Sequence, residues 1–380
     1  MADIRRSRAA QFGPIGLKAN IAVAGLRTGN GFGRDGPVAA KDAALVAHLR
    51  KAGYSFAAQQ PMDEAAFGAT GDNPHHGRLD NPAAPGHSPG GSSCGGAVAV
   101  AGGMLVGGMG VGGMAAAIGT DTLGSVRIPA AYCGIIGFKP SRGMMPMEGV
   151  VPLSPSMDDA GVMARDIAVL AEVVSHFLPT RRRNYPRTIL APEDLGPATP
   201  EVQAAFEAAV ECLLDAGFNV QRRRIPGWTP ETHRRAAVLL IEAEGAAVHR
   251  ELVDGEDAAM SGAVRTALRF GRDARAAKIV DAVQTLRRTE QAMTRIFDTC
   301  DLIAVPTTPS PAYAWAEGPP RDQALFTALA NWAGLPAISI PVPVRGRPIG
   351  LQLIGGRGRD WSVIQAATSF LAAAAAHWRA

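Results

Sequence analysis

Cysteines are scarce in this sequence, and their spacing indicates neither a disulfide scaffold nor a metal site. The four are Cys94, Cys133, Cys212 and Cys300; none forms a C-x-x-C pair, and none has a histidine at metal-ligand spacing. Secreted disulfide scaffolds carry many more, so we predict a reducing, cytoplasmic environment and no metal. Arginines near the N-terminus are not followed by an apolar run, so we expect no secretory signal.

Lysines and aromatic residues are also few, which argues against a nucleic-acid partner. Most of the 38 basic residues are arginines, the net charge is only +4, and aromatic residues make up 6%. No basic helix face interleaved with aromatics is present, although nucleic-acid-binding surfaces commonly have one. We interpret the arginine triplet at 181–183 as a solvated connector.

Charged residues are absent from positions 81–120. The part from Ala97 to Gly119 is long enough to span a bilayer, but glycine and alanine give little insertion energy and no aromatic or basic anchors flank it. We therefore expect a buried helix running into a buried strand, and no membrane partner. A G-x-G-x-x-G match at Gly108, Gly110 and Gly113 lacks the strand-then-helix order and the distant acid of a dinucleotide site, and we reject it.

Strands and helices alternate along the 380 residues, which predicts an α/β fold. We expect buried strands at 14–24, 54–60, 301–309, 335–344 and 349–355. Helices are expected at 39–52, 158–178, 198–216, through most of 230–299, near 320–333 and at 361–377. Residues 68–96 read as a long loop and 179–196 as a connector.

Lys18 is the first candidate for chemistry, because it lies inside the apolar strand pattern of 14–24. Burial disfavours an ammonium group, so it would lower the pKa of Lys18 toward neutrality and produce an amine that accepts a proton. The alternatives are a side chain that reaches the strand end, or one that pairs with a carboxylate such as Asp121.

Two serine turns complete the candidate set. Ser92 lies in the run Gly90–Gly95, and Ser125 follows Thr122, Leu123 and Gly124. Successive backbone N–H groups in such a turn can point into one concavity and form an oxyanion hole, with Asp121 and Arg127 fixing the turn. The alternatives are a flexible Gly/Ser turn at Ser92 and a plain turn with Asp121–Arg127 pairing at Ser125. Together the segments suggest a relay in which Lys18 deprotonates Ser92, and Ser92 deprotonates Ser125 for attack on an acyl carbon.

At these segments the sequence resembles the amidase signature family. The main matches are GHSPGGSSCGGA (86–97), GTDTLGSVRIPAAYCGIIGFKPSRG (119–143) and GPIGLKANIAVAGLRT (13–28). Further matches lie at 62–77, 156–166, 300–312 and 331–355. The resemblance covers nearly the whole chain and is poorest at about 180–298.

The resemblance implies an amide hydrolase with a Ser–cis-Ser–Lys triad and no cofactor. Ser125 would be the nucleophile, Ser92 the bridging serine after a cis peptide, and Lys18 the base. Backbone N–H groups of Thr122, Leu123, Gly124 and Ser125 would form the oxyanion hole. The implied fold is one large α/β/α domain, 1–380, around a mixed twisted sheet. Within it, 13–178 carries the motifs, 179–299 is a connector and variable helical region, and 300–380 returns to the sheet.

The sequence departs from the family pattern at several points. Leu123 stands where a glycine is usual, Cys94 follows the paired serines in place of glycine, and Ala19 replaces the aspartate often found after the lysine. The two serines are 125 − 92 = 33 residues apart, more than is usual, with the extra length at 102–113. We expect an additional bulge or loop there.

Several functions remain open at this point. The leading one is hydrolysis of a small linear amide, with release of ammonia or an amine. The alternatives are a glutaminase subunit of an amidotransferase, a non-catalytic homologue whose serines are separated by the insertion, and a membrane-associated Gly/Ala-rich protein. The sequence leaves the oligomeric state open, with a homodimer as one alternative.

Overall fold

The computed structural model describes residues 13–102, 114–180 and 185–377 and contains one ten-stranded sheet. The G-x-G-x-x-G match and nearly all of the extra 102–113 segment lie outside the described residues. The strand order is β2-β1-β5-β7-β6-β11-β12-β10-β8-β9. The strands are β1 (Ile15–Lys18), β2 (Phe56–Gln60), β5 (Ala116–Asp121), β6 (Ile136–Lys139), β7 (Asp159–Ala164), β8 (Thr188–Ala191), β9 (Asn219–Arg222), β10 (Leu302–Pro306), β11 (Ala337–Pro341) and β12 (Gly350–Gly355).

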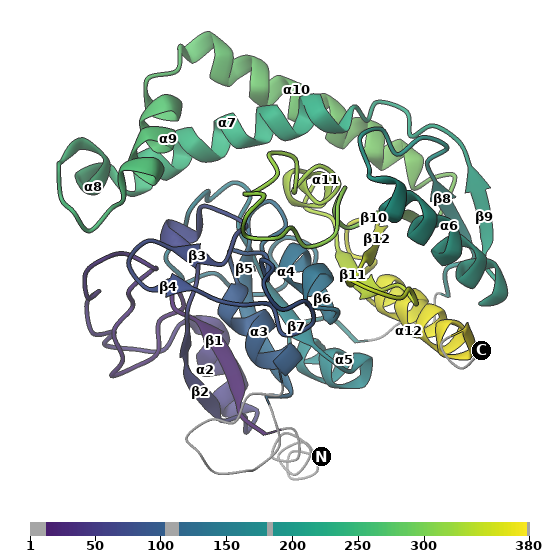
Figure 1. The fold of residues 1–380 in the computed structure, drawn as a ribbon, viewed down its shortest axis with the longest axis horizontal. Coiled ribbons are helices and arrows are strands. Elements are labelled where there is room, and N and C mark those ends of the chain that lie inside the picture. The colour runs from purple at the N-terminus through teal and green to yellow at the C-terminus, as the bar shows by residue number, and fades with distance from the viewer. Residues whose placement is uncertain (1–12, 103–113, 181–184, 378–380) are drawn as a thin grey trace.

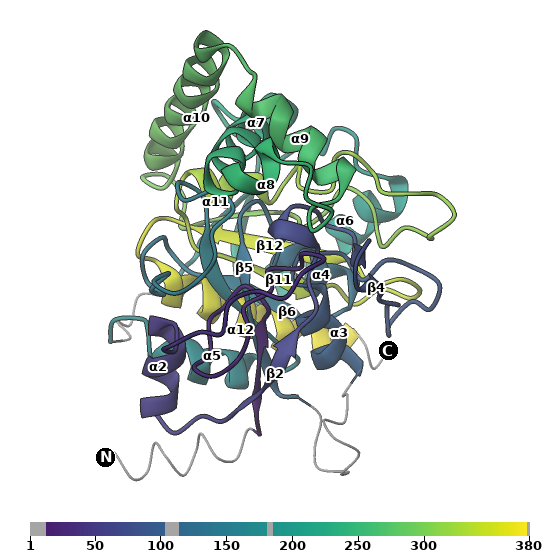
Figure 2. The same cartoon turned by 90° about the vertical axis from the view of Figure 1, so that its left-hand side faces the viewer.

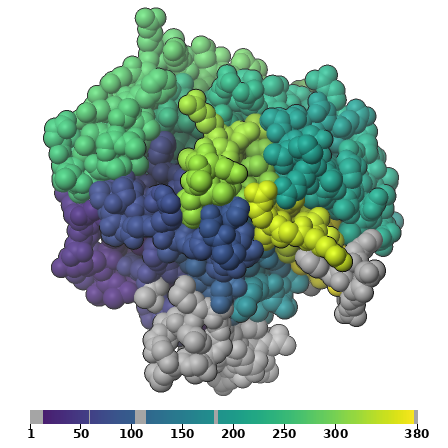
Figure 3. All heavy atoms as spheres, in the orientation of Figure 1, coloured from purple at the N-terminus to yellow at the C-terminus, as the bar shows by residue number. Residues whose placement is uncertain are grey.

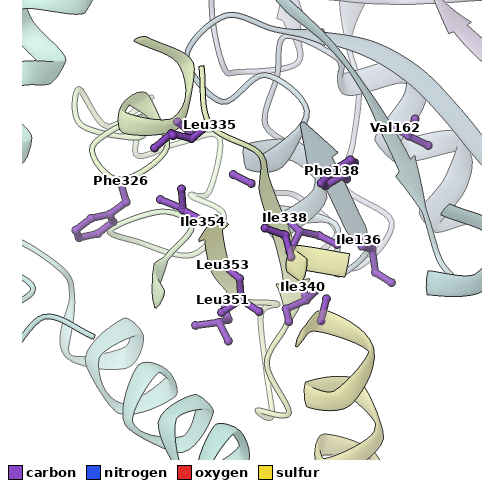
Figure 4. Close-up of a cluster of buried hydrophobic side chains, with 14 of the residues drawn as sticks. Ile136, Phe138, Val162, Phe326, Leu335, Ile338, Ile340, Leu351, Leu353 and Ile354 are labelled. Carbon is purple, nitrogen blue, oxygen red and sulfur yellow. The ribbon is translucent and has the colours of Figure 1, made fainter. Parts of the chain in front are cut away.

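The sheet is mixed, as expected. Pairing is parallel at both edges, where β1 joins β2 and β5, and where β8 joins β9 and β10. The middle of the sheet, from β5 to β10, is antiparallel throughout. Its central strands are short aliphatic runs because both of their faces are covered. Figure 4 shows side chains of β6, β7, β11 and β12 packed together in this core, among them Phe138, Ile338 and Leu353.

Helices cover the two faces of the sheet (Figures 1 and 2). On one face lie α3 (Cys94–Gly102) and α4 (Arg127–Tyr132), which contact each other and the strands. On the other lie α5 (Ile167–Ser175), α12 (Asp360–His377) and α6 (Pro200–Asp215), with α12 in contact with both of the others. The remaining short elements are α2 (Ala44–Lys51), α11 (Ala328–Trp332), η1 (Glu64–Ala66), β3 (Asp72–Asn73) and β4 (Gly77–Arg78). The predicted α/β/α layering is therefore confirmed.

A helical segment forms one end of the molecule, drawn in green in Figures 1 and 3. It consists of α7 (Pro230–Val248), α8 (Arg250–Asp254), α9 (Gly262–Arg272) and α10 (Ala276–Ile296). The helix α7 contacts α9, α10 and α11. This confirms the prediction of helix through most of 230–299, and it places α7 beside the turn of Ser125.

The interpretation of 158–178 as one helix is wrong. Its first part is the buried strand β7, and α5 begins only at Ile167. The acids at 158 and 159 suggest a helix start, but Asp159 instead accepts a hydrogen bond from buried Lys139 at 2.9 Å. Asp166 is the true N-cap, since its carboxylate accepts the N–H of Ala168 at 2.6 Å.

The interpretation of 179–196 as a plain connector is also wrong. It contains β8, which pairs with β9 and β10, so the variable region contributes two strands to one edge of the sheet. The sequence pattern also did not indicate α4 or β6, and it predicted more helix near 320–333 than the five residues of α11. Each of these elements is six residues or shorter, too short for a period to be counted reliably.

None of the helices in the described part of the chain combines the length and apolar character needed to cross a lipid bilayer. The uncharged stretch instead supplies α3 and β5, as expected. Among the described residues, no group of three or more His, Cys, Asp or Glu side chains is placed to hold a metal ion.

Candidate active site

Lys18 lies at the end of β1, between β2 and β5, with a side chain only 2% exposed. Its Nζ donates to Ser92 Oγ at 2.8 Å, to Thr120 Oγ1 at 2.9 Å and to the Thr120 carbonyl at 3.5 Å. Within the described residues it forms no ion pair, so the sequence alternative of a Lys18–Asp121 pair is wrong. A neutral amine has two N–H groups and one lone pair. Thr120 can take the two N–H groups, which leaves the lone pair for Ser92.

Burial is the main influence on the protonation of Lys18, and it lowers the pKa of this ammonium to about 8. Nearby acidic groups oppose the shift. Burial also raises the pKa of the Cys94 thiol well above its usual range, so this thiol is neutral near pH 8 and supplies no negative charge. The carboxylates of Asp63, Asp158 and Asp121 are therefore the groups that limit the lowering of the Lys18 pKa. A substantial neutral fraction of Lys18 exists at ordinary pH.

The Ser92 turn is held by Asp63. The peptide bond between Gly91 and Ser92 is cis, and Ser92 is fully buried. The N–H of Asp63 donates to the Ser92 carbonyl at 3.2 Å, while its carboxylate accepts the N–H groups of Thr70 and Gly71 at 2.7 Å each. A Cβ at Gly91 would lie 2.4 Å from Asp63 Oδ2. Only glycine therefore fits at position 91 beside this carboxylate.

Asp121 and Arg127 organise the turn that presents Ser125. Arg127 is completely buried, and it donates through Nη2 and Nε to the two carboxylate oxygens of Asp121 at 2.8 and 3.0 Å. Burial alone would raise the pKa of Asp121, but the Arg127 guanidinium holds it well below its usual range. The same carboxylate accepts the N–H groups of Gly124 and Val126 at 2.8 and 3.1 Å. The predicted Asp–Arg pairing is therefore present.

Arg127 also ties the turn to the C-terminal part of the chain. Its Nη1 donates to the Thr327 carbonyl and to Gln352 Oε1, and its Nη2 donates to Asn331 Oδ1. Asn331 in turn donates to the backbone and side chain of Asp121 at 2.7 and 2.9 Å. Strand β12 and helix α11 therefore hold a turn that lies about 200 residues earlier in the sequence.

The backbone of the Ser125 turn is oriented by two further side chains. Thr327 Oγ1 donates to the Leu123 carbonyl at 2.6 Å, and Thr122 Oγ1 donates to Asp158 at 2.7 Å. Gly124 has φ +130°, and a Cβ there would lie 2.4 Å from Thr327 Oγ1. Leu123 has no positive φ, so its side chain is accommodated without backbone strain.

The predicted oxyanion donors differ in availability. The N–H of Gly124 is already donated to Asp121. In the described ranges, the N–H groups of Thr122, Leu123 and Ser125 have no hydrogen-bond acceptor, and all three residues line the cavity. These three N–H groups are therefore free to donate to a negatively charged oxygen.

The two serine turns are joined directly. The N–H of Ser93 donates to the Ser125 carbonyl at 3.1 Å, and Ser93 Oγ donates to the Thr120 carbonyl at 3.1 Å. The turns meet although the extra 102–113 segment separates them in sequence. Ser125 is 7% exposed and lines a cavity of about 210 Å³. The cavity wall is mostly apolar, with side chains that include Phe67, Leu123, Ile128, Leu153 and Ile241.

Several residues of this arrangement were not assigned a role from the sequence. They are Asp63, Thr120, Asp158, Thr327, Asn331 and Gln352. Most of them lie inside segments that carry the family resemblance, so the sequence could have marked them as candidates. It could not have shown their hydrogen-bond partners, because those partners are distant in the sequence.

Comparison with known proteins places the chain in a family. A model of the Amidase family matches residues 12–364. The chain belongs to the amidase signature family. It is 33% identical to an indoleacetamide hydrolase of Pseudomonas savastanoi over 375 residues, which cover 91% of this chain and 80% of that protein. This family membership makes the chain a hydrolase acting on amides.

Two further relatives extend the comparison. A glutamyl-tRNA(Gln) amidotransferase subunit from Thermus thermophilus is 31% identical, with 96% of this chain and 86% of that protein covered. A crystal structure of an amidase superimposes with a TM-score of 0.84 at 29% identity, covering 98% of this chain and 88% of that one. These relatives support hydrolysis of an amide C–N bond as the general reaction of this protein.

Proposed function

We propose that this amidase cleaves a small linear amide through an acyl-enzyme on Ser125. The observation that carries the proposal is the hydrogen bond of 2.8 Å between buried Lys18 and Ser92, on a turn joined to that of Ser125. A neutral amine beside a buried serine supplies a proton acceptor without a histidine. The cavity of about 210 Å³ is smaller than the roughly 300–1,000 Å³ of sites for drug-sized ligands, which favours a small substrate.

In the proposed reaction, neutral Lys18 accepts the proton of Ser92, and Ser92 accepts the proton of Ser125 as Ser125 Oγ attacks the amide carbon. The N–H groups of Thr122, Leu123 and Ser125 stabilise the resulting oxyanion. The C–N bond then breaks, and the proton returns through Ser92 to the leaving nitrogen. Water attacks the acyl-enzyme and releases the acid. No cofactor or metal takes part in this proposal.

The test is release of ammonia from a panel of small primary amides by the purified protein, with Ser125→Ala in parallel. We expect ammonia from at least one amide with the wild type and none above background with the variant. Equal release by both proteins would overturn the proposal and leave a non-catalytic homologue as the better account.

A glutaminase component of an amidotransferase is the second candidate, because the chain is 31% identical to the Thermus thermophilus amidotransferase protein. Such a component would release ammonia from glutamine and work faster with a partner and an acceptor present. An independent amidase works alone and accepts other amides. We propose the independent amidase, in the reducing cytoplasm, where the four unpaired thiols would persist. The oligomeric state stays open, with a homodimer as one alternative.

The proposed base predicts a rising pH profile. Lys18 reacts as the neutral amine, and burial lowers its pKa to about 8, so the reactive fraction grows as pH rises through about 8. Well below that pKa the neutral fraction falls tenfold for each pH unit. We therefore expect kcat/KM to rise from pH 6 to pH 8 and to level off above pH 9. A profile that is flat over this whole range would contradict Lys18 as the base.

Leu123 predicts a limit on acyl size, since it lines the cavity beside Ser125. Leu123→Gly enlarges the cavity and restores the residue usual in the family. We expect kcat/KM to increase several-fold for amides with a bulkier acyl group than the best wild-type substrate, and to fall for the smallest ones. A series of straight and branched aliphatic amides measures the change. Unaltered ranking of the series would show that Leu123 does not set acyl size.

A further inference from the structure

Arg234 is an unpaired positive charge in the wall of the Ser125 cavity. It lies in α7, is half-buried, and its Nε is buried with no hydrogen-bond partner. Within the described residues no carboxylate lies within ion-pair distance of its guanidinium. Asp322 is the acid with the largest electrostatic influence on Arg234, and it forms no ion pair with it. A buried N–H group without an acceptor is costly, so the Nε of Arg234 has a hydrogen bond that a ligand can accept.

Arg235, the next residue in α7, differs from Arg234 in both exposure and pairing. Arg235 is exposed and forms an ion pair with Glu231, one turn away in α7. Its charge is therefore both solvated and compensated. The two arginines share one helix and one side-chain chemistry, but only Arg234 borders the cavity of Ser125. Arg234 also borders a second cavity, which α7 forms with the end of α9 and the start of α10, so its side chain contributes to the walls of both cavities.

The rest of the cavity wall favours an anionic ligand. Arg321 contributes a second guanidinium, and the described lining contains no Asp or Glu. Gln323 is held in place, since its Nε2 donates to the Ala69 carbonyl at 3.0 Å. The rest of the lining is mainly apolar, through side chains such as Val238 and Ile241. A substrate with an amide at one end, a short methylene chain and a carboxylate at the other matches this combination of a serine, apolar side chains and guanidinium groups.

We propose that this site selects amides with an anionic group at the far end of the acyl chain, the monoamides of short dicarboxylic acids, through the guanidinium of Arg234. This inference rests on the proposed function, because it places the amide of the substrate at Ser125. Arg234 is then a specificity-determining residue that binds the carboxylate and leaves the reacting atoms to the serines.

The test compares charged and uncharged substrates of matched shape. The probes are the monoamides of malonic, succinic, glutaric and adipic acid, each against a neutral amide in which an isopropyl group replaces the carboxylate. Hydrogen bonds to charged groups contribute about 1.5–3 kcal/mol, so we expect kcat/KM of the wild type to favour one of the acids by roughly ten- to a hundredfold. Arg234→Gln should remove that preference while changing the neutral amides by less than about twofold.

Two further variants separate charge recognition from a structural effect. Arg234→Lys keeps the positive charge but loses the planar guanidinium group, and should retain part of the preference for the acids. Arg235→Gln changes the paired neighbour on the same helix, and should leave all rates unchanged. Equal rates for acids and neutral isosteres in the wild type would overturn the inference. An equal loss for both classes in Arg234→Gln would also overturn it, because it would indicate a structural role.

A binding measurement keeps the inference testable if the proposed reaction fails. Calorimetry would measure the affinity of the same four monoamides for Ser125→Ala and for Ser125→Ala combined with Arg234→Gln. Affinity for one of the acids that falls tenfold or more in the double variant supports the anionic subsite even without turnover. Equal affinity, or no binding to either protein, overturns it. Absence of hydrolysis with retained binding would count against the Ser125 mechanism alone.

Discussion

Lys18→Ala lowers the rate of acylation by about 10²–10⁴-fold at neutral pH, the usual contribution of general base catalysis. The substitution removes the group that donates to Ser92 Oγ and Thr120 Oγ1 at 2.8 and 2.9 Å. In the described ranges no other amine or imidazole contacts Ser92, so no second base replaces it. Raising the pH should not restore the rate, since the titrating group itself is gone. The initial rate of ammonia release from the best amide measures the loss.

The control for this variant is Lys41→Met. Lys41 is exposed, with its side chain paired to Glu148 at the surface, and it has no contact with the serine turns. We expect it to keep both the rate and the pH profile of the wild type. The melting temperature of Lys18→Ala should be recorded beside it, so that unfolding is not mistaken for lost catalysis. A folded Lys18→Ala protein with full activity would show that Lys18 is not the base.

Asp121→Asn destabilises the fold and removes activity together. The carboxylate of Asp121 accepts from Gly124, Arg127 and Asn331 through Oδ1, and from the N–H of Val126 and Nε of Arg127 through Oδ2. Either orientation of an asparagine amide would point its NH₂ group at these donors. The charge of Arg127 would also remain buried without its partner. Breaking a buried pair on one side costs about 3–5 kcal/mol.

The measurement is the free energy of unfolding from denaturant titration, with ammonia release as the second readout. Glu148→Gln serves as the control, because it removes one partner of the exposed pair with Lys41 and should leave the unfolding midpoint unchanged. Similar midpoints for Asp121→Asn and the wild type would show that the Asp121–Arg127 pair does not hold the turn of Ser125.

Much of this site could be predicted from the sequence because its chemistry is concentrated in three short segments. A lysine in an apolar strand made a buried amine one of the alternatives, and the structure places Lys18 in β1 with a lowered pKa. The glycine-flanked serines likewise marked two tight turns. Asp121 and Arg127, six residues apart, are local enough for their pairing to be expected from spacing.

The contacts that hold the site were beyond sequence reasoning, since they join segments distant in the chain. Nothing local indicates that Thr327 and Asn331 reach the Ser125 turn, or that Asp63 supports the turn of Ser92. The reading of 158–178 as one helix was wrong for a related reason. The acids at its start satisfy buried partners, Thr122 for Asp158 and Lys139 for Asp159, and do not cap a helix. The position of an acidic residue in the sequence does not show which hydrogen-bond donor its carboxylate will contact in the fold.

The central claim is that Ser125 is an activated nucleophile, and covalent labelling tests it without knowledge of the substrate. The purified protein is treated with a serine-reactive fluorophosphonate, and its intact mass is recorded beside that of Ser125→Ala. We expect one adduct on the wild type and none on the variant. No adduct on either protein, or the same adduct on both, would contradict it.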